Sequence, residues 1–599
     1  MLTAAALTRA ESCLSCARMA ALPDWTYHPL RRPMGALLGV QRSRRAALGL
    51  VAAVATFPGG RWLVAGLGHT SPPPEASTTF SGVRFASPVG ATVSIDSARN
   101  AARAFPALGA GLLEIGPISS GSVDEARRVL DGSPGPIALR VAADDAQGVI
   151  DALGSRAALV VLDLTEGPAV LELLNRIRAL TTVPVFAGLD AEHALVLPDG
   201  AGVVIRNASP KDVKQAGGRS RSVIATTAKG SPAYAASLIG AGAAAVLATP
   251  AALIEAGPGW FHRATIARLA RARLETPAPP ASRWPWMAGL ALGLGMIGGG
   301  IGAAVVAFGP VLLPYDESFL LITSSGLAAI NPRLIHFLQH DRITLAGTMV
   351  ALGLMYSALS WWGIRRGQAW ARDALLASCL IGFPTLFYFF AYRYVEPIHV
   401  ALAAILFPLF VIATWRRPRG AYLIEEEGPA EERQLALIGQ LLMVSAGAGL
   451  IVGGLTISYV GLTSVFVPAD LTYMSASAQA LASANDRLIS FIAHDRAGFG
   501  GALISTGVAV LLIAAWGWKR GQAWVWWSLA TSATVGFGAA LAIHIGVAYT
   551  DFWHVAPIYA GILITVIGLV LAREYFLTVP SRAQVPPTAT GELNAARPS

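Results

Sequence analysis

Ionisable residues recur in the same order in two copies within the apolar C-terminal half of the chain. A His-Asp-Arg triplet occurs at His340–Arg342 and again at His494–Arg496. Two further motifs are shared, Pro-x-Asp at Pro314–Asp316 and Pro468–Asp470, and Tyr-x-acid-x-x-His at Tyr394–His399 and Tyr549–His554. Ionisable side chains are costly inside a membrane, so their survival in both copies indicates a site or a fixed polar network.

Imidazole and carboxylate groups in this number suit a divalent metal ion. The second copy keeps a glycine-rich stretch at Gly498–Gly501, which favours it as the functional copy. Its candidate metal-binding residues are His494, Asp495, Asp470, Asp551 and His554. The first-copy equivalents are Asp316, His340, Asp341, Glu396 and His399. If each copy forms its own four-helix bundle, the residues of one copy lie together.

Other chemistries fit the same residues. The clusters would serve a proton relay or a quinone headgroup, and paired histidines could bind haem. A carboxylate at a helix start also caps the helix and forms ion pairs, so a purely structural network remains an alternative. His336 and His544 have no counterpart in the other copy, which indicates local features.

Composition identifies an integral membrane protein in contact with lipid. Of 599 residues, 54% are hydrophobic and 14% are charged, whereas soluble domains carry about 25% charged residues. The net charge of +9 comes from scattered basic residues without a nucleic-acid-binding motif, so no nucleic-acid partner is expected. The sequence leaves self-association into an oligomer open.

Eight apolar spans are predicted, four in each of two tandem four-helix repeats at 284–415 and 434–575. The spans are 285–308, 343–363, 375–393, 397–415, 436–460, 500–517, 526–547 and 556–573. Basic residues favour cytoplasmic loops, which predicts a multi-pass inner-membrane protein with the preceding domain on the cytoplasmic side. The Asp–His motifs then lie at the outer edge.

The N-terminal half alternates short strand-like runs with helical segments, which predicts a (β/α)8 barrel at 82–275. The strand candidates are Val83–Ala86, Gly111–Ile115, Pro136–Val141, Ala158–Leu164, Val183–Gly188, Gly202–Ile205, Ser222–Thr226 and Ala243–Leu247. Residues 24–66 are Arg-rich and apolar, and predict helices lying on the membrane surface. Residues 1–23 and 576–599 are expected to be a disordered extension and tail.

Residues 24–275 resemble the class 2, quinone-dependent dihydroorotate dehydrogenases. Tyr27–Arg32 resembles the membrane-docking segment of that family, Gly82–Asp96 its first strand and flavin loop, and Gly109–Gly116 its second strand. Ala241–Ala243 followed by Gly257-Pro258 resembles the end of its last βα unit. The resemblance implies FMN in the barrel and a membrane quinone as electron acceptor. The implied cofactor-binding positions are Asp96, Asn207, Thr226, Thr227 and Thr249.

The chain departs from that family at its chemistry. Ser97 stands where the family has a lysine, the substrate loop and its serine base have no counterpart, and Thr226-Thr227 replaces two glycines of the phosphate loop. Without a general base, oxidation of dihydroorotate is not expected. Two hypotheses follow: a flavin-linked oxidoreductase that delivers electrons to quinone from another substrate, or a non-catalytic barrel serving as scaffold or sensor for the membrane module.

Overall fold

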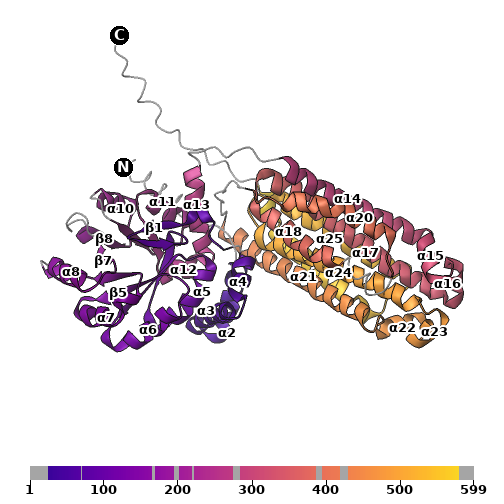
Figure 1. Ribbon diagram of the computed structural model, residues 1–599, viewed down its shortest axis with the longest axis horizontal. Helices are drawn as coiled ribbons and strands as arrows, with labels where there is room; N and C mark the ends of the chain where they lie inside the picture. The colour runs from indigo at the N-terminus through magenta and orange to yellow at the C-terminus, as the bar shows by residue number, and fades with distance from the viewer. Residues whose placement is uncertain are drawn as a thin grey trace, which may run out of the picture.

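The computed structural model describes residues 24–68, 70–164, 169–194, 202–218, 222–273, 283–385, 394–418 and 429–578. A barrel formed by the N-terminal half lies at one end of an elongated bundle of long helices formed by the C-terminal half (Figure 1). The predicted disordered segment 1–23 and tail residues 579–599 lie outside the described residues.

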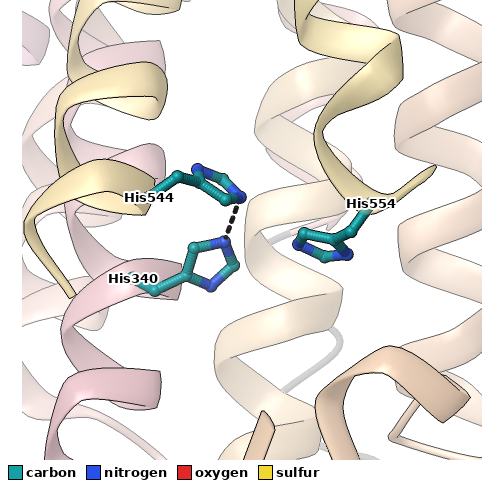
Figure 2. A group of neighbouring side chains, drawn as sticks. All are labelled: His340, His544 and His554. Atoms are coloured by element: carbon teal, nitrogen blue, oxygen red, sulfur yellow. Dashed lines mark hydrogen bonds between the residues drawn. The ribbon is translucent and has the colours of Figure 1, made fainter. Parts of the chain in front are cut away.

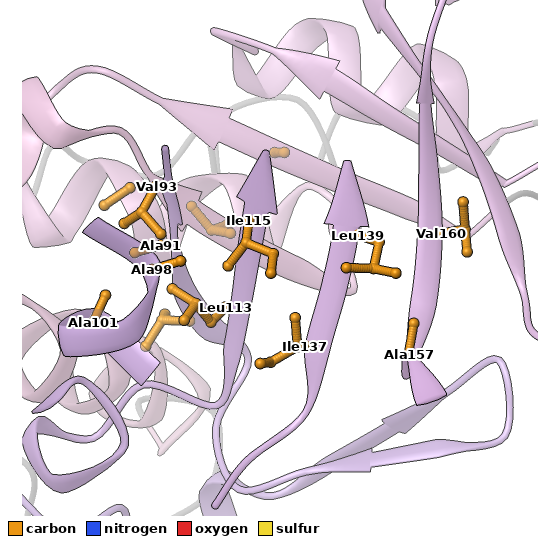
Figure 3. Close-up of a cluster of buried hydrophobic side chains, with 14 of the residues drawn as sticks. Ala91, Val93, Ala98, Ala101, Leu113, Ile115, Ile137, Leu139, Ala157 and Val160 are labelled. Carbon is orange, nitrogen blue, oxygen red and sulfur yellow. The ribbon is translucent and has the colours of Figure 1, made fainter. Parts of the chain in front are cut away.

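Eight parallel strands close the barrel in the order β10-β3-β4-β5-β6-β7-β8-β9. They are β3 (Val89–Val93), β4 (Leu112–Ile118), β5 (Ile137–Ala142), β6 (Leu159–Asp163), β7 (Val185–Asp190), β8 (Gly202–Arg206), β9 (Val223–Thr227) and β10 (Ala245–Ala248). Alternate strand residues such as Leu113, Ile115 and Leu139 point outward and pack against surrounding helices, including α5 (Ile95–Ala104) (Figure 3). The predicted (β/α)8 fold is therefore confirmed.

The first predicted strand was wrong. Val83–Phe85 forms β2, which pairs antiparallel with β1 (Thr78–Phe80) outside the barrel. The stacked rings of Phe80 and Phe85 belong to the apolar cluster that fills the barrel interior. Gly90 made the true strand β3 look weak in sequence, but a Cβ there would lie 1.9 Å from Leu112 O, so the close approach of β3 to β4 requires glycine.

Three helices connect the barrel to the bundle: α2 (Asp24–Leu38), α3 (Val40–Thr56) and α4 (Gly60–Gly68). The buried carboxylate of Asp24 pairs with Arg263 of the barrel and lies 3.7 Å from Arg433 of the bundle. Trp516 of the bundle donates from Nε1 to Gly66 O at 3.0 Å. The segment predicted to lie on a membrane surface thus packs between the two domains.

The helical module has matching elements in its two halves. The first half comprises α14 (Arg283–Phe308), α15 (Pro314–Leu320), α16 (Ser324–Ile330), α17 (Pro332–Ala358), η6 (Leu359–Gly363), η7 (Ile364–Arg366), α18 (Ala369–Thr385) and α20 (Pro397–Thr414). The second comprises α21 (Ala430–Leu462), α22 (Pro468–Met474), α23 (Ala478–Ala484), α24 (Leu488–Trp516), α25 (Ala523–Gly546) and α26 (Phe552–Leu577). The short helices of both halves lie at the end remote from the barrel (Figure 1).

Seven helices among the described residues are long and apolar enough to cross a membrane. They are Arg283–Phe308, Pro332–Arg366, Pro397–Thr414, Glu431–Leu462, Leu488–Trp516, Ala523–Gly546 and Phe552–Leu577. The third of the eight predicted spans, 375–393, begins in α18, but 386–393 lie outside the described residues.

Candidate functional site

Two buried arginines organise the polar residues at the remote end of the bundle. Arg342 Nε lies 2.9 Å from Asp495 Oδ2, and its Nη1 lies 3.4 Å from Asp316 Oδ2. Arg496 mirrors this arrangement, with Nε 3.1 Å from Asp341 Oδ2 and Nη1 2.6 Å from Asp470 Oδ2. Each arginine therefore joins one carboxylate from its own half to one from the other half.

The exchange between halves extends to the helix starts. Asn331, the N-cap of α17, donates to Met474 O in the second half at 2.8 Å, whereas Asn485 donates to Leu320 O in the first half at 2.8 Å. The residues grouped by copy in sequence are consequently regrouped in space. The expectation that each copy assembles its own cluster is corrected, because α17 and α24 present their His-Asp pairs to the opposite half.

Two buried tyrosines complete this framework. Tyr394 donates its hydroxyl to Asp316 Oδ1, and Tyr549 donates to Asp470 Oδ1 at 2.7 Å. Burial and the adjacent carboxylate raise the pKa of both tyrosines, so both stay protonated donors. Burial likewise raises the pKa of the Asp316 carboxyl, against the lowering effect of Arg342.

The first of two histidine clusters, here called the three-His cluster, comprises His340 of α17, His544 of α25 and His554 of α26 (Figure 2). His340 Nε2 and His544 Nε2 are 2.9 Å apart. His340 and His544 are buried and His554 is half-buried. One nitrogen from each ring lies within 4.8 Å of the others, a geometry that could hold a metal ion.

The second cluster, here called the His–Glu cluster, comprises Glu396, His399 and His494. Glu396 Oε2 lies 2.6 Å from His399 Nδ1, and His494 Nδ1 lies 3.1 Å from Asp495 Oδ1. The pKa of Glu396 is lowered, because hydrogen bonding and charge attraction from His399 outweigh the raising effect of burial. This cluster also offers ligand atoms within 4.8 Å of one another.

The carboxylates predicted as metal ligands mostly support other groups. Asp470 accepts from Val467 N at 2.8 Å as well as from Tyr549 and Arg496. Asp551 is exposed and caps α26 by accepting from His554 N at 2.9 Å. These two aspartates are therefore already engaged by hydrogen bonds and ion pairs within the fold.

An apolar cavity of about 110 Å³ adjoins the His–Glu cluster. His399 and His494 line it together with Tyr356 and Ser505, and the remaining wall is mainly Leu, Met, Phe and Ala side chains. Tyr356 and Ser505 have hydroxyl oxygens 3.3 Å apart. The cavity thus combines an apolar wall with hydrogen-bonding groups.

Charged residues fill the interior of the barrel at the carboxyl ends of its strands. Arg206 Nη1 lies 2.8 Å from Glu114 Oε1, and its Nη2 lies 2.9 Å from Asp163 Oδ1. Thr92 donates to Glu114 Oε1 at 2.8 Å, and Arg140 Nε lies 3.6 Å from Asp163 Oδ2. These side chains largely satisfy one another.

The predicted cofactor-binding residues gather only in part. Asn207 N donates to Thr226 Oγ1 at 2.9 Å, and Thr249 N donates to Thr227 O at 2.9 Å, so these four share one side of the barrel mouth. Asp96 is exposed in the first turn of α5 and does not join the other four. Thr249 Oγ1 is buried without a hydrogen-bond partner among the described residues.

His544 was the functional candidate that sequence reasoning discounted. It lacks a counterpart in the first half, yet it lies against His340 at the centre of the three-His cluster. His544 Nδ1 lies 2.6 Å from the carbonyl oxygen of Ala540, four residues earlier in the chain. The sequence alone could not show that His544 also has a partner on another helix.

Comparisons with known proteins do not assign a family. No protein-family model matches the chain, and neither does any of the curated proteins compared with it. Similar solved structures include a ligand-free DHODH from Eimeria tenella, with 17% identity over 36% of this chain and 94% of that one, at a TM-score of 0.29. Two variants of mandelate oxidase are also similar. One carries a monooxide FMN adduct, with 18% identity over 33% of this chain and 76% of that one, at a TM-score of 0.25.

The second mandelate oxidase variant, with benzoylformic acid, has 19% identity over 38% of this chain and 92% of that one, at a TM-score of 0.24. At these scores the likeness assigns no activity. The barrel fold rests on the closed parallel sheet of this chain itself.

Proposed function

We propose that this protein is a membrane redox protein whose helical module binds the headgroup of a quinone. The apolar cavity beside His399 and His494 carries the proposal. Quinones combine a flat lipophilic ring with two carbonyl oxygens that accept hydrogen bonds. Ligand sites are typically apolar with a few well-placed polar groups, and this cavity offers imidazole and hydroxyl groups against Leu and Met side chains.

The His–Glu cluster would supply the protons of quinone chemistry. Reduction of a quinone to a quinol adds two electrons and two protons, and oxidation returns them. Glu396 and Asp495 each contact one imidazole Nδ1, which leaves each Nε2 available for proton exchange with a carbonyl oxygen. In this proposal His399 and His494 are the residues that exchange protons with the ligand.

The barrel offers a phosphate position for FMN at the ends of its last two strands. Barrels commonly bind phosphate there, beside a short helix. Thr249 has a free buried hydroxyl at the start of α12 (Pro250–Ala256), and Thr227 lies beside it, so these two residues would hold the phosphate. FMN, when bound, would supply hydride acceptance and electron transfer.

The two sites lie too far apart for direct electron transfer. Helix α24 runs about 33 Å from His494 to Trp516, at about 1.5 Å rise per residue, and Trp516 contacts α4 beside the barrel. A quinone diffusing in the bilayer could carry electrons between the two ends. The side chain of Tyr27 in α2 donates to Ile254 O at 3.2 Å, so the helices joining the domains contact α12, the helix that follows Thr249.

One observation favours a second function for the barrel. The Glu114–Arg206–Asp163 network already pairs the charged groups that would face a flavin ring. The barrel would then be a non-catalytic scaffold or sensor for the helical module. In either case we propose a multi-pass inner-membrane location with the barrel in the cytoplasm, as the basic loops indicate.

The first test is the visible absorbance spectrum of the detergent-purified protein, followed by quinone titration. Flavin bands that a reductant bleaches would support a catalytic barrel. Their absence from folded protein would favour the non-catalytic scaffold. Short-chain quinone binding tests the module separately. Ala403→Phe, which fills the cavity from α20, should weaken binding at least about 10-fold, equivalent to about 1.4 kcal/mol.

The matched control is Ala404→Phe, because Ala404 is exposed on the same helix and does not line the cavity. Equal quinone affinity in both folded variants would contradict the proposed site.

A further inference from the structure

The three-His cluster has one histidine from the first half of the module and two from the second, and the quinone proposal uses none of them. Its histidines come from α17, α25 and α26, and their rings face one another (Figure 2). The hydrogen-bond partners of the three rings indicate which species can lie among them.

The Nδ1 atoms of His544 and His554 each contact a group outside the cluster. His544 Nδ1 lies 2.6 Å from Ala540 O, and because a carbonyl oxygen only accepts, this nitrogen must carry the proton. His340 Nδ1 lies 3.0 Å from Asp341 Oδ1 without the geometry of a hydrogen bond, so this buried nitrogen has no hydrogen-bond partner among the described residues.

His554 follows the pattern of His544. Its Nδ1 lies 3.4 Å from the hydroxyl oxygen of Tyr549. Tyr549 spends its own proton on Asp470, so the hydroxyl oxygen is left to accept. Neutral His544 and His554 therefore each direct an unprotonated Nε2 away from these partners.

His340 Nε2 and His544 Nε2 are 2.9 Å apart. Either a proton on His340 Nε2, donated to His544, or a metal ion accounts for so short a separation. A proton joins one pair, whereas a metal ion can also engage His554, the third nitrogen within 4.8 Å.

We infer that His340, His544 and His554 bind a divalent transition-metal ion of the class that prefers imidazole, such as Zn²⁺. Three histidines leave one position of a tetrahedral ion open for water or a ligand. Tetrahedral coordination needs nitrogens about 3.3 Å apart, so small ring rotations from the observed separations suffice. Asp341, Ala540 and Tyr549 would then orient the ligands, as outer partners do in metal sites.

Asp341 also binds Arg496, whose own carboxylate partner Asp470 accepts from Tyr549. Two of the three ligands are therefore fixed by one ion-pair network. The counterpart position in the first half has no equivalent of His544, since Phe389 and Phe390 stand there in sequence. The inference is accordingly specific to the three-His cluster.

The test measures metal binding by the full-length protein in detergent after chelator treatment. Zn²⁺ content and Co²⁺ titration are the readouts, because Co²⁺ bound by three nitrogens absorbs visible light strongly in a tetrahedral site. One metal ion per chain is expected. His544→Phe, which introduces the residue type of the other half, should weaken binding at least about 10-fold, and His554→Asn should do the same.

A control variant should keep full binding: His336→Ala, which changes a histidine of α17 outside both clusters. If His544→Phe fails to fold, the metal affinity of His554→Asn, which changes a half-buried residue, provides the test. Absence of metal uptake by folded wild-type protein, or unchanged affinity in the folded cluster variants, would overturn the inference and leave a shared proton between His340 and His544.

Discussion

The two histidine clusters have the same framework but different centres. In each, an arginine bridges carboxylates from both halves, a tyrosine donates to the aspartate of its own half, and the arginine lies over a phenylalanine of the other half: Arg342 over Phe491 and Arg496 over Phe337. At the centres, one cluster has three histidines and the other has two histidines and Glu396. The ion-pair framework therefore constrains the fold, whereas the central residues were free to diverge.

Backbone geometry supports this division. Val311 and Val465 both adopt left-handed backbone conformations, with φ of 62° and 64°, which a β-branched residue rarely does. The carbonyl oxygen of each accepts from the arginine of its own half, Arg342 and Arg496 respectively. Both halves thus keep the same strained turn to position an arginine, independently of which ligands lie nearby.

Removing an arginine should produce the largest effect. Arg496→Met leaves Asp341 and Asp470 buried without their cation, which should cost about 3–5 kcal/mol in unfolding free energy. Arg342→Met should cost less, because Arg342 is more exposed and its contact to Asp316 is longer. Thermal unfolding in detergent measures both. A smaller loss for Arg496→Met than for Arg342→Met would show that the two frameworks are not equivalent.

Exchanging the ligands should separate the two centres. His399→Ala should weaken quinone binding about 10- to 100-fold, through loss of a hydrogen bond worth about 1.5–3 kcal/mol, and should leave metal content unchanged. His554→Ala should have the reverse effect. Parallel quinone titration and metal analysis of both proteins check this, and equal loss of both activities in both variants would indicate one shared site.

The sequence identified residues of the buried polar network, but it did not predict which of them contact one another. The repeated motifs identified His340, Asp341, His494 and Asp495, and all four lie in the buried network. Their partners could not be deduced, because helix crossings that exchange residues between copies leave no trace in the spacing of either copy. His544 was discounted because it occurs once, although a residue that differs between copies is the one expected where their functions differ.

The barrel shows the same limit in a different form. Its class followed from eight alternating units, but its first strand was predicted at Val83–Ala86, whereas the first barrel strand is Val89–Val93. Strand propensity disfavours Gly90 and Ala91, and only the distance to Leu112 O explains why a glycine is needed. Tertiary packing overrode the local signal at that point.

Helix crossings should respond alike in both halves. A Cβ at Gly353 would lie 2.6 Å from Gly293 O, and one at Gly507 would lie 2.8 Å from Gly447 O. Gly353→Ala and Gly507→Ala should therefore each cost about 1–3 kcal/mol through overpacking. Gly298→Ala and Gly449→Ala are matched controls with open space around the new methyl group, and should be neutral or slightly stabilising. The unfolding midpoints of the four variants test this prediction. An unchanged midpoint for Gly507→Ala would contradict matched helix packing in the two halves.

The smallest expected difference is in how stability depends on pH, and only the His–Glu cluster should show it. The folded pKa of Glu396 is lowered, because the attraction of His399 exceeds the opposing effect of burial. Its charge therefore stabilises the fold above the unfolded pKa, and this contribution is lost as the pH falls through the folded pKa. Glu396→Gln should cost about 1 kcal/mol or less at neutral pH and nothing in acid, whereas Asp551→Ala should show a loss typical of a helix cap, about 1 kcal/mol. Unfolding curves of both variants against pH test the contrast, and it fails if the effect of Glu396→Gln grows as the pH falls.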